Sequence, residues 1–155
     1  MIVVRPDVGE RIQLDEAQVE LDVGLVGDNW LVRGSSKTED GKAHPEAQIT
    51  LMNTRVIDLL AGSRDRWELA GDQIYVDMDL SERNTPPGSR LRIGDALLEI
   101  TAKPHTGCAK FRDRFGQPAA LWVNSEVGTD LKARGLNAKV ITAGTMRVGD
   151  VAVVM

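Results

Sequence analysis

The stretch RLRIGDALLEI (Arg90–Ile100) consists of two short runs of alternating apolar and polar residues on either side of a Gly-Asp pair. Glycine adopts the positive φ of a tight turn, and the alternation gives each run one buried face. The stretch therefore predicts a β-hairpin. The C-terminal TMRVGDVAVVM (Thr145–Met155) has the same pattern. We therefore expect a second, similar hairpin.

Short β-type runs separated by turn residues continue along the whole chain. The expected strands are Ile2–Arg5, Arg11–Leu14, Val19–Asp22, Trp30–Arg33, Gln48–Met52, Gln73–Met78, Arg90–Ile93, Ala96–Thr101, Ala138–Thr142, Met146–Val148 and Val151–Val154. Three or four short helices are expected at Thr54–Ala61, Gly107–Phe115, Ala119–Val127 and Thr129–Arg134, with Thr54 and Thr106 as N-caps. The pattern predicts a mainly β domain with barrel-like closure, and the long spacing of βαβ units is absent.

Length and composition restrict the class of protein. The chain has 155 residues, 42% of them hydrophobic and 27% charged, which fits a single globular domain over residues 1–155. Its one cysteine excludes an internal disulfide framework and multi-cysteine zinc or iron–sulfur sites. The longest apolar runs have about five residues, against about 20 for a membrane span, and no secretory signal is visible. We expect a cytoplasmic protein with a reduced thiol and no membrane partner.

The net charge of −4 conceals an uneven distribution. Residues 1–80 carry 8 basic and 16 acidic side chains, whereas residues 81–155 carry 11 basic and 7 acidic ones. A basic second half predicts an anion-binding face. The excess is too small for a DNA-binding surface, and the six aromatic residues are too dispersed for a nucleic-acid stacking platform. We therefore expect no nucleic-acid partner.

The segment KPHTGCAKFRDRFG (Lys103–Gly116) holds the one candidate nucleophile, Cys108. Neighbouring cations and the start of a helix favour the thiolate, which is the reactive form. The alternative is an inert, buried cysteine. His105 is a candidate general acid or ligand contact, or else an ordinary surface or core residue. Lys110 adds a positive charge to the segment.

Further candidates lie in loops and near expected helix ends. His44 lies near the end of the polar segment Gly34–Pro45, which we expect to be a mobile loop that contacts a ligand; the alternative is an ordinary surface or core histidine. Arg83 and Asn84 precede a Pro-Pro-Gly turn and present an anion-binding pair or an ordinary solvated loop. The other polar candidates, either caps or ligand anchors, are Asn124, Arg134 and Asn137. The sequence contains no P-loop, GxGxxG, GxSxG or HExxH motif.

Four separate segments carry a resemblance to a known family. The run GDQIYVDMDLSERNTPPGSRLRIGDALLEITAKPHTGCAKF (Gly71–Phe111) resembles the heart of the MOSC domain, named from the C-terminal part of molybdenum-cofactor sulfurases. GLVGDNW (Gly24–Trp30) and RGLNAKVITAGTMRVGD (Arg134–Asp150) resemble it as well. The resemblance covers about residues 20 to 152. It implies a β-barrel fold of the pyruvate-kinase type, with a cleft that holds one cysteine.

The resemblance also implies a chemistry for the cleft. Cys108 would carry sulfur as a persulfide or ligate the molybdenum of a molybdopterin cofactor. The implied cofactor-binding residues are His44, Arg83, Asn84, His105, Lys110, Asn124, Arg134 and Asn137. Pyridoxal phosphate is often associated with the family, but no site in this sequence argues for it. The 155 residues leave no room for a fused desulfurase domain, so we expect sulfur to come from a separate donor such as a cysteine desulfurase.

Three functions are open at this point. The first is a persulfide sulfur carrier that acts on the molybdenum cofactor or a related metal–sulfur centre, for example in a molybdoenzyme partner. The second is a molybdenum-dependent reductase of N-hydroxylated compounds, which would need a partner reductase for electron supply. The third is a non-catalytic module that delivers or senses the cofactor. A cleft that has lost its activity is the remaining alternative.

Overall fold

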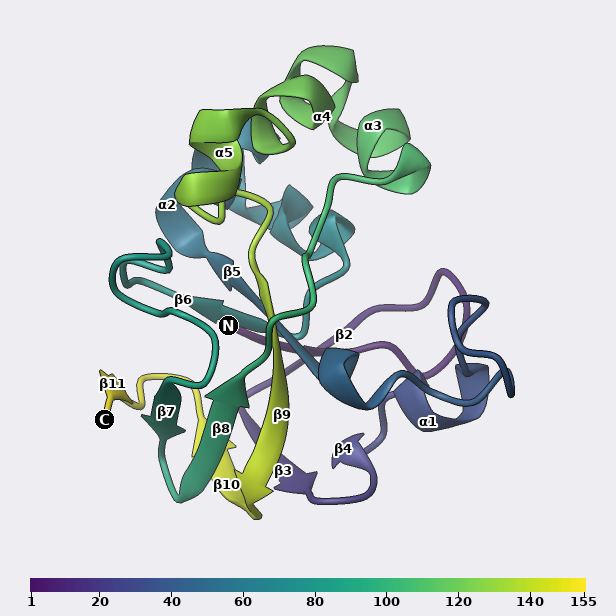
Figure 1. Ribbon diagram of the computed structural model, residues 1–155, viewed down its shortest axis with the longest axis vertical. Coiled ribbons are helices and arrows are strands. Elements are labelled where there is room, and N and C mark those ends of the chain that lie inside the picture. The colour runs from purple at the N-terminus through teal and green to yellow at the C-terminus, as the bar shows by residue number, and fades with distance from the viewer.

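The computed structural model describes all residues, 1–155, and shows a mainly β protein (Figure 1). The strands are β1 (Ile2–Val4), β2 (Ile12–Leu14), β3 (Glu16–Glu20), β4 (Gly24–Leu25), β5 (Ile49–Asn53), β6 (Ile74–Val76), β7 (Arg90–Ile93), β8 (Ala96–Ile100), β9 (Leu136–Thr142), β10 (Gly144–Arg147) and β11 (Ala152–Val154). An eight-stranded sheet has the order β11-β7-β8-β9-β5-β6-β1-β2, and a three-stranded sheet has the order β10-β3-β4. The large sheet curls into a half-barrel, which confirms the predicted fold class.

The interior between the two sheets is apolar. Alternation along β7 and β8 buries Leu91, Leu98 and Ile100, which are at most 1% exposed. The small sheet adds Leu25 and Met146 to the same cluster of 18 buried residues. Burial of each large aliphatic side chain contributes about 1.5–3 kcal/mol. This core holds the small sheet against the large one.

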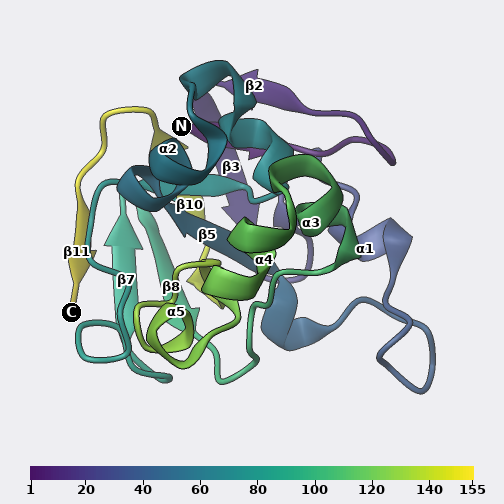
Figure 2. The same ribbon diagram turned by 90° about the horizontal axis from the view of Figure 1, so that it is seen from above.

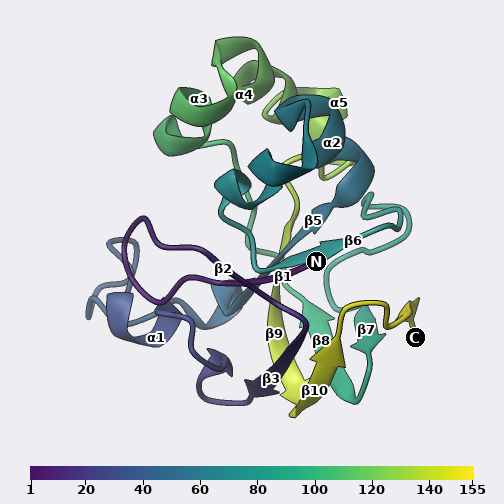
Figure 3. The same ribbon diagram turned by 180° about the vertical axis from the view of Figure 1, so that it is seen from behind.

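Helices α2 to α5 gather on one side of the sheets, whereas α1 lies apart from them (Figures 1, 2 and 3). The α-helices are α1 (Trp30–Arg33), α2 (Thr54–Ala61), α3 (Ala109–Phe115), α4 (Gln117–Val123) and α5 (Glu126–Asp130), and the 3-10 helices are η1 (Pro45–Ala47) and η2 (Arg64–Ala70). Helices α2 to α4 and η2 enclose a second core of ten buried residues, which includes Tyr75 and Phe111. None of the helices has the length and apolar character needed to cross a membrane.

The two Gly-Asp segments fold differently. Arg90–Ile100 forms the expected hairpin, with β7 antiparallel to β8. The predicted second hairpin is wrong, because β10 pairs with β3 in the small sheet and β11 pairs with β7 in the large one. Strand β11 pairs with the free edge of β7, where Ala152 lies opposite Ile93. The C-terminal segment therefore connects the two sheets.

Other local predictions also need correction. Trp30–Arg33 is helix α1 rather than a strand, because no neighbouring strand pairs with it and only Trp30 is buried. Asn53, not Thr54, caps α2, since its side-chain oxygen accepts bonds from the backbone N–H groups of Arg55 and Val56.

The helix that follows Cys108 starts later than expected. Helix α3 begins at Ala109, so Cys108 is its N-cap residue and Thr106 lies outside it. The next two helices begin and end earlier than expected. Helix α4 covers Gln117–Val123 and α5 covers Glu126–Asp130, where Ser125 accepts a capping hydrogen bond from Gly128 N. The thiol therefore lies in the loop before the helix rather than within its first turn.

Candidate functional site

Two adjoining cavities lie where the rim of the large sheet meets the helices. The larger cavity has a volume of about 610 Å³ and the smaller cavity about 440 Å³. Segment Lys103–Thr106 and Arg134 border both of them. Cys108, the one free cysteine, is exposed and lines the larger cavity.

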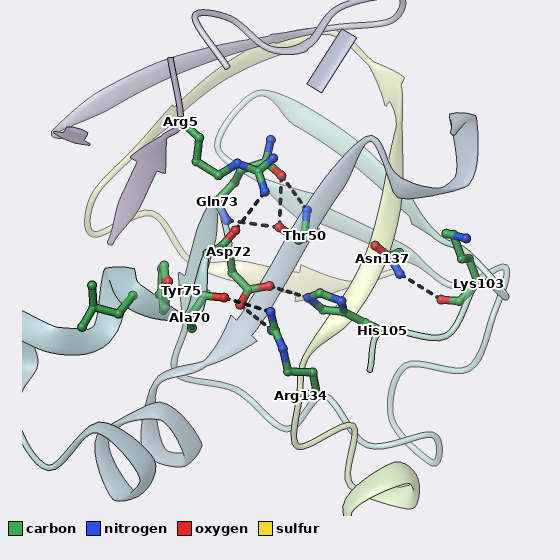
Figure 4. Close-up of polar contacts among 12 residues, drawn as sticks. Arg5, Thr50, Ala70, Asp72, Gln73, Tyr75, Lys103, His105, Arg134 and Asn137 are labelled. Carbon is green, nitrogen blue, oxygen red and sulfur yellow. Dashed lines mark hydrogen bonds and ion pairs between the residues drawn. The ribbon is translucent and has the colours of Figure 1, made fainter. Parts of the chain in front are cut away.

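A buried carboxylate stands at the centre of this region (Figure 4). Asp72 follows η2 and is 0% exposed. Its Oδ2 accepts a hydrogen bond from Arg134 Nη1 at 2.6 Å, and its Oδ1 lies 2.7 Å from His105 Nε2. Burial alone would raise the pKa of Asp72, but the charge of Arg134, the charge that His105 carries at acidic pH and the hydrogen bonds of both outweigh it and lower the pKa to about 2. The carboxylate is therefore ionised at neutral pH.

The same contact fixes the protonation of His105. Burial lowers its pKa below the usual value of 6.5, Arg134 lowers it further, and Asp72 only partly opposes them. The ring is therefore neutral at pH 7. An ionised carboxylate can only accept, so Nε2 carries the proton and donates it to Asp72. No protein group bonds Nδ1, and the ring borders both cavities, so an unprotonated nitrogen opens onto them.

Arg134 is held by more than the carboxylate. Its Nη2 donates to the carbonyl of Ala70 at 2.9 Å, and its guanidinium lies over the Phe111 ring, 4.9 Å from the centroid. The following residue, Gly135, has a φ of 97°, and a Cβ there would lie 2.1 Å from the carbonyl oxygen of Leu51. Only glycine fits this close approach. This close approach fixes the backbone position immediately after Arg134.

Two asparagines hold the segment that leads to the thiol. Asn137 donates from Nδ2 to the carbonyl of Lys103 at 3.1 Å. Asn124 bonds Gly107 twice, accepting from its N–H at 2.8 Å and donating to its carbonyl at 2.9 Å. The backbone is therefore fixed near both ends of the segment that runs from Lys103 to Cys108.

The larger cavity is strongly cationic. Eight basic side chains line it, against two carboxylates, Asp7 and Asp113. Two of the cations are neutralised, Arg5 by Asp28 and Arg134 by Asp72. The other six form no salt bridge: Arg11, Arg33, Lys37, Lys103, Lys110 and Arg114. The cavity therefore presents a surplus of positive charge to any ligand.

Three guanidinium groups converge around Gly71. Arg5 donates from Nη1 to its carbonyl at 2.8 Å, while Arg11 Nη2 and Arg114 Nη1 lie 3.6 and 3.7 Å from the position of a Cβ on Gly71. Burial lowers the pKa of Arg11, and Arg114 and Arg5 lower it further. The Nε of Arg11 is buried without a partner. Like charges and an unused donor at one place create a demand for an anion.

The structure brings some of the sequence-predicted residues together and leaves others apart. Those that line the larger cavity are Cys108, His105, Lys110, Arg134 and Asn137. Asn124 borders the smaller cavity. Three lie outside both cavities: His44 caps η1 by accepting from Glu46 N, Asn84 donates to the carbonyl of Asp79 at 2.7 Å, and Arg83 is exposed in the same loop. The Gly34–Pro45 loop, which projects from the sheets in Figure 2, reaches the larger cavity through Lys37 instead.

Sequence reasoning missed Asp72 and the arginines around Gly71. Asp72 contacts His105 and Arg134, which lie 33 and 62 positions away in the chain. No local spacing marks such a contact. Arg11 and Arg33 lie in the acidic first half, where the charge count predicts no anion site. No group of three or more His, Cys, Asp or Glu side chains is placed to hold a metal ion.

Comparisons with known proteins agree with this architecture. The model of the MOSC domain family matches residues 38–153. YiiM from Escherichia coli superimposes with a TM-score of 0.63 at 22% identity, over 99% of this chain and 67% of its own. The YuaD protein of Bacillus subtilis gives 0.62 at 16% identity, over 96% and 90%. A hypothetical protein gives 0.64 at 22% identity, and the chain spans only 65% of its length. No curated protein sequence matches.

Proposed function

The chain belongs to the MOSC domain family, and from this premise we propose that it is a sulfur carrier. In this proposal Cys108 accepts sulfane sulfur as a persulfide, while the larger cavity binds the acceptor, a molybdenum cofactor or a similar phosphate-bearing anion. One observation carries the proposal: the chain's only thiol is exposed and lines the same cavity as six cations without salt-bridge partners.

The residues of the larger cavity fit an anionic cofactor with a metal–sulfur centre. The unpartnered buried Nε of Arg11 and the guanidinium of Arg114, which bonds the Leu69 carbonyl but no carboxylate, would hold phosphate oxygens. Lys110, two residues after Cys108, would neutralise charge near the thiol. A thiolate is a soft ligand that suits metals bound to sulfur. When bound, the cofactor would supply the metal centre for the sulfur chemistry.

The loading step balances without an external oxidant. The thiolate of Cys108 attacks the outer sulfur of a persulfide on the donor, which we take to be a cysteine desulfurase. A new S–S bond forms on Cys108, the S–S bond of the donor breaks, and the donor leaves as a thiolate. The sulfane sulfur keeps its oxidation state throughout. Exposure of Cys108 is what allows a protein donor to reach it.

Intact mass spectrometry tests the proposal. Wild-type protein incubated with a cysteine desulfurase and free cysteine should gain one sulfur, about 32 Da, that dithiothreitol removes. Cys108→Ser should gain nothing. An unmodified wild-type mass, with a desulfurase shown to be active by its alanine production, would contradict sulfur transfer. In that case retained anion binding by Cys108→Ser would identify a binding module.

A further inference from the structure

The buried carboxylate of Asp72 has no part in the sulfur-carrier chemistry described so far. We propose that Asp72 and Arg134 hold His105 as its Nε2–H tautomer, so that Nδ1 is the proton acceptor for the Cys108 thiol. Asp72 is then a positioning residue, which acts through His105. The inference builds on the proposed function only in assigning a use to Cys108.

The two oxygens of Asp72 have separate partners, and this division determines the tautomer. Oδ2 accepts from Arg134 at 2.6 Å, and Oδ1 faces His105 Nε2 at 2.7 Å. Arg134 is itself fixed by the Ala70 carbonyl at 2.9 Å, so the carboxylate cannot rotate without losing a bond. A base oriented by a third group is the arrangement that activates nucleophiles in many enzymes.

His105 is the neutral acceptor of a cavity wall made mostly of donors. The charged groups that act on its ring are Asp72, Arg134 and Arg5. The remaining acidic groups of the larger cavity are Asp7 and Asp113, and Asp113 pairs with Arg112. A proton released into this cavity therefore has an acceptor in Nδ1 that adds no negative charge to compete with an anionic ligand.

The loop places the imidazole and the thiol on the same cavity. His105 and Cys108 both line it, three residues apart, and Asn124 holds Gly107 between them. The proton balance of the transfer step then closes. No hydrogen bond joins the two side chains, so the proton crosses the cavity that they share. His105 Nδ1 takes up the proton of the Cys108 thiol before the resulting thiolate attacks, and it returns the proton to the thiolate that leaves the donor.

Replacing Asp72 by Asn gives a specific prediction. The amide must present its oxygen to Arg134, which can only donate, so its NH₂ group faces His105. Nε2 must then accept, and the ring is forced into the Nδ1–H tautomer. The side chain keeps its size, but the nitrogen that faces the cavities can no longer take up a proton.

Nitrogen-15 NMR of the imidazoles reads the tautomer directly. The chain has two histidines, so His44→Gln assigns the His105 signals. We expect a protonated Nε2 and a bare Nδ1 in the wild type at pH 7, and the reverse in Asp72→Asn. A wild-type ring in the Nδ1–H form would overturn the proposal. The wild-type spectrum decides this even where the variant folds poorly.

Alkylation of Cys108 by iodoacetamide tests the coupling to the thiol. At pH 7 we expect His105→Gln and Asp72→Asn to react about tenfold more slowly than the wild type. Asp77→Asn is the matched acid-to-amide control, since Asp77 pairs with Arg55 at the surface, and it should react at the wild-type rate. Equal rates in all four proteins would overturn the proposal. Neither measurement uses a sulfur donor, so a failed mass-shift experiment leaves this inference standing on its own result.

Discussion

Two sets of cationic side chains meet at Gly71 and Asp72, and they differ in how their charge is balanced. On one side, Arg134 bonds buried Asp72 and Arg5 bonds buried Asp28. On the other side, Arg11 and Arg114 approach each other without a carboxylate. The difference separates the charges that are neutralised within the fold from those that are not. Carboxylates neutralise the paired set, whereas the unpaired set keeps its charge available for a ligand, although Arg114 Nη1 also donates to the Leu69 carbonyl.

The largest change in the free energy of unfolding should follow from breaking the paired set. Asp72→Ala leaves Arg134 buried without its partner and should lower the free energy of unfolding by about 3–5 kcal/mol. Asp77→Ala removes the exposed partner of Arg55 and should cost less than about 1 kcal/mol. Urea denaturation measures both. Equal losses in the two variants would mean that the paired set has no special structural role.

The next effect concerns the unpaired set and its ligand. Inorganic pyrophosphate at about 100 times its Kd should stabilise the wild type by about 2.7 kcal/mol, and added salt should reduce the effect. The double variant Arg11→Gln/Arg114→Gln should lose this stabilisation, whereas the surface variant Arg55→Gln should keep it. Thermal unfolding with and without pyrophosphate measures the difference. Stabilisation of the double variant to the wild-type extent would place the anion elsewhere.

The free energy of unfolding should depend on pH through the ionisation of Asp72 in the paired set and of its partner His105. The pKa of Asp72 is about 2 in the fold, below its usual 3.8, so its contribution of about 2 kcal/mol is present above pH 4 and lost as the pH falls towards 2. The pKa of His105 is also lowered from 6.5, so the unfolded chain takes up this proton first and stability begins to fall below pH 6.5. Urea denaturation across pH 3–7 should show both slopes. His105→Gln should remove the upper one, and a flat profile would contradict the pairing.

The smallest change in the free energy of unfolding should follow from removing the unpaired set in the absence of a ligand. Arg11→Gln/Arg114→Gln relieves repulsion between like charges but removes the bond from Arg114 Nη1 to the Leu69 carbonyl, so the free energy of unfolding should stay within about 1 kcal/mol of the wild type. Urea denaturation in low-salt buffer free of phosphate measures it. A loss as large as that of Asp72→Ala would show that these arginines are structural as well.

The sequence predicts the elements whose signals are local. The hairpin Arg90–Ile100 and the helix Thr54–Ala61 form as expected, because alternation, turn glycines and helical spacing act over a few residues. Thr145–Met155 has the same local signal as the hairpin, yet its two strands join different sheets. The free edge of β7 decides that outcome, and a strand edge belongs to the assembled sheet rather than to the segment.

The site follows the same rule. Cys108, His105 and Lys110 are close in the sequence, and all three line the larger cavity. His44 is expected at the cleft from its polar loop, but its ring caps η1 instead. No local sequence signal indicates Asp72, because its partners come from the loop before α3 and from the segment just before β9. Long-range pairing of buried charges is the part of the site that a single sequence does not reveal.

The central claim is that the thiol of Cys108 and the unpaired cations form one site, and protection from alkylation tests it most directly. Increasing concentrations of inorganic pyrophosphate should slow the reaction of Cys108 with iodoacetamide in a saturable way. The protection should disappear in Arg11→Gln/Arg114→Gln and persist in Arg55→Gln. Pyrophosphate that stabilises the wild type but leaves the alkylation rate unchanged would contradict the claim, because the anion and the thiol would then occupy separate places.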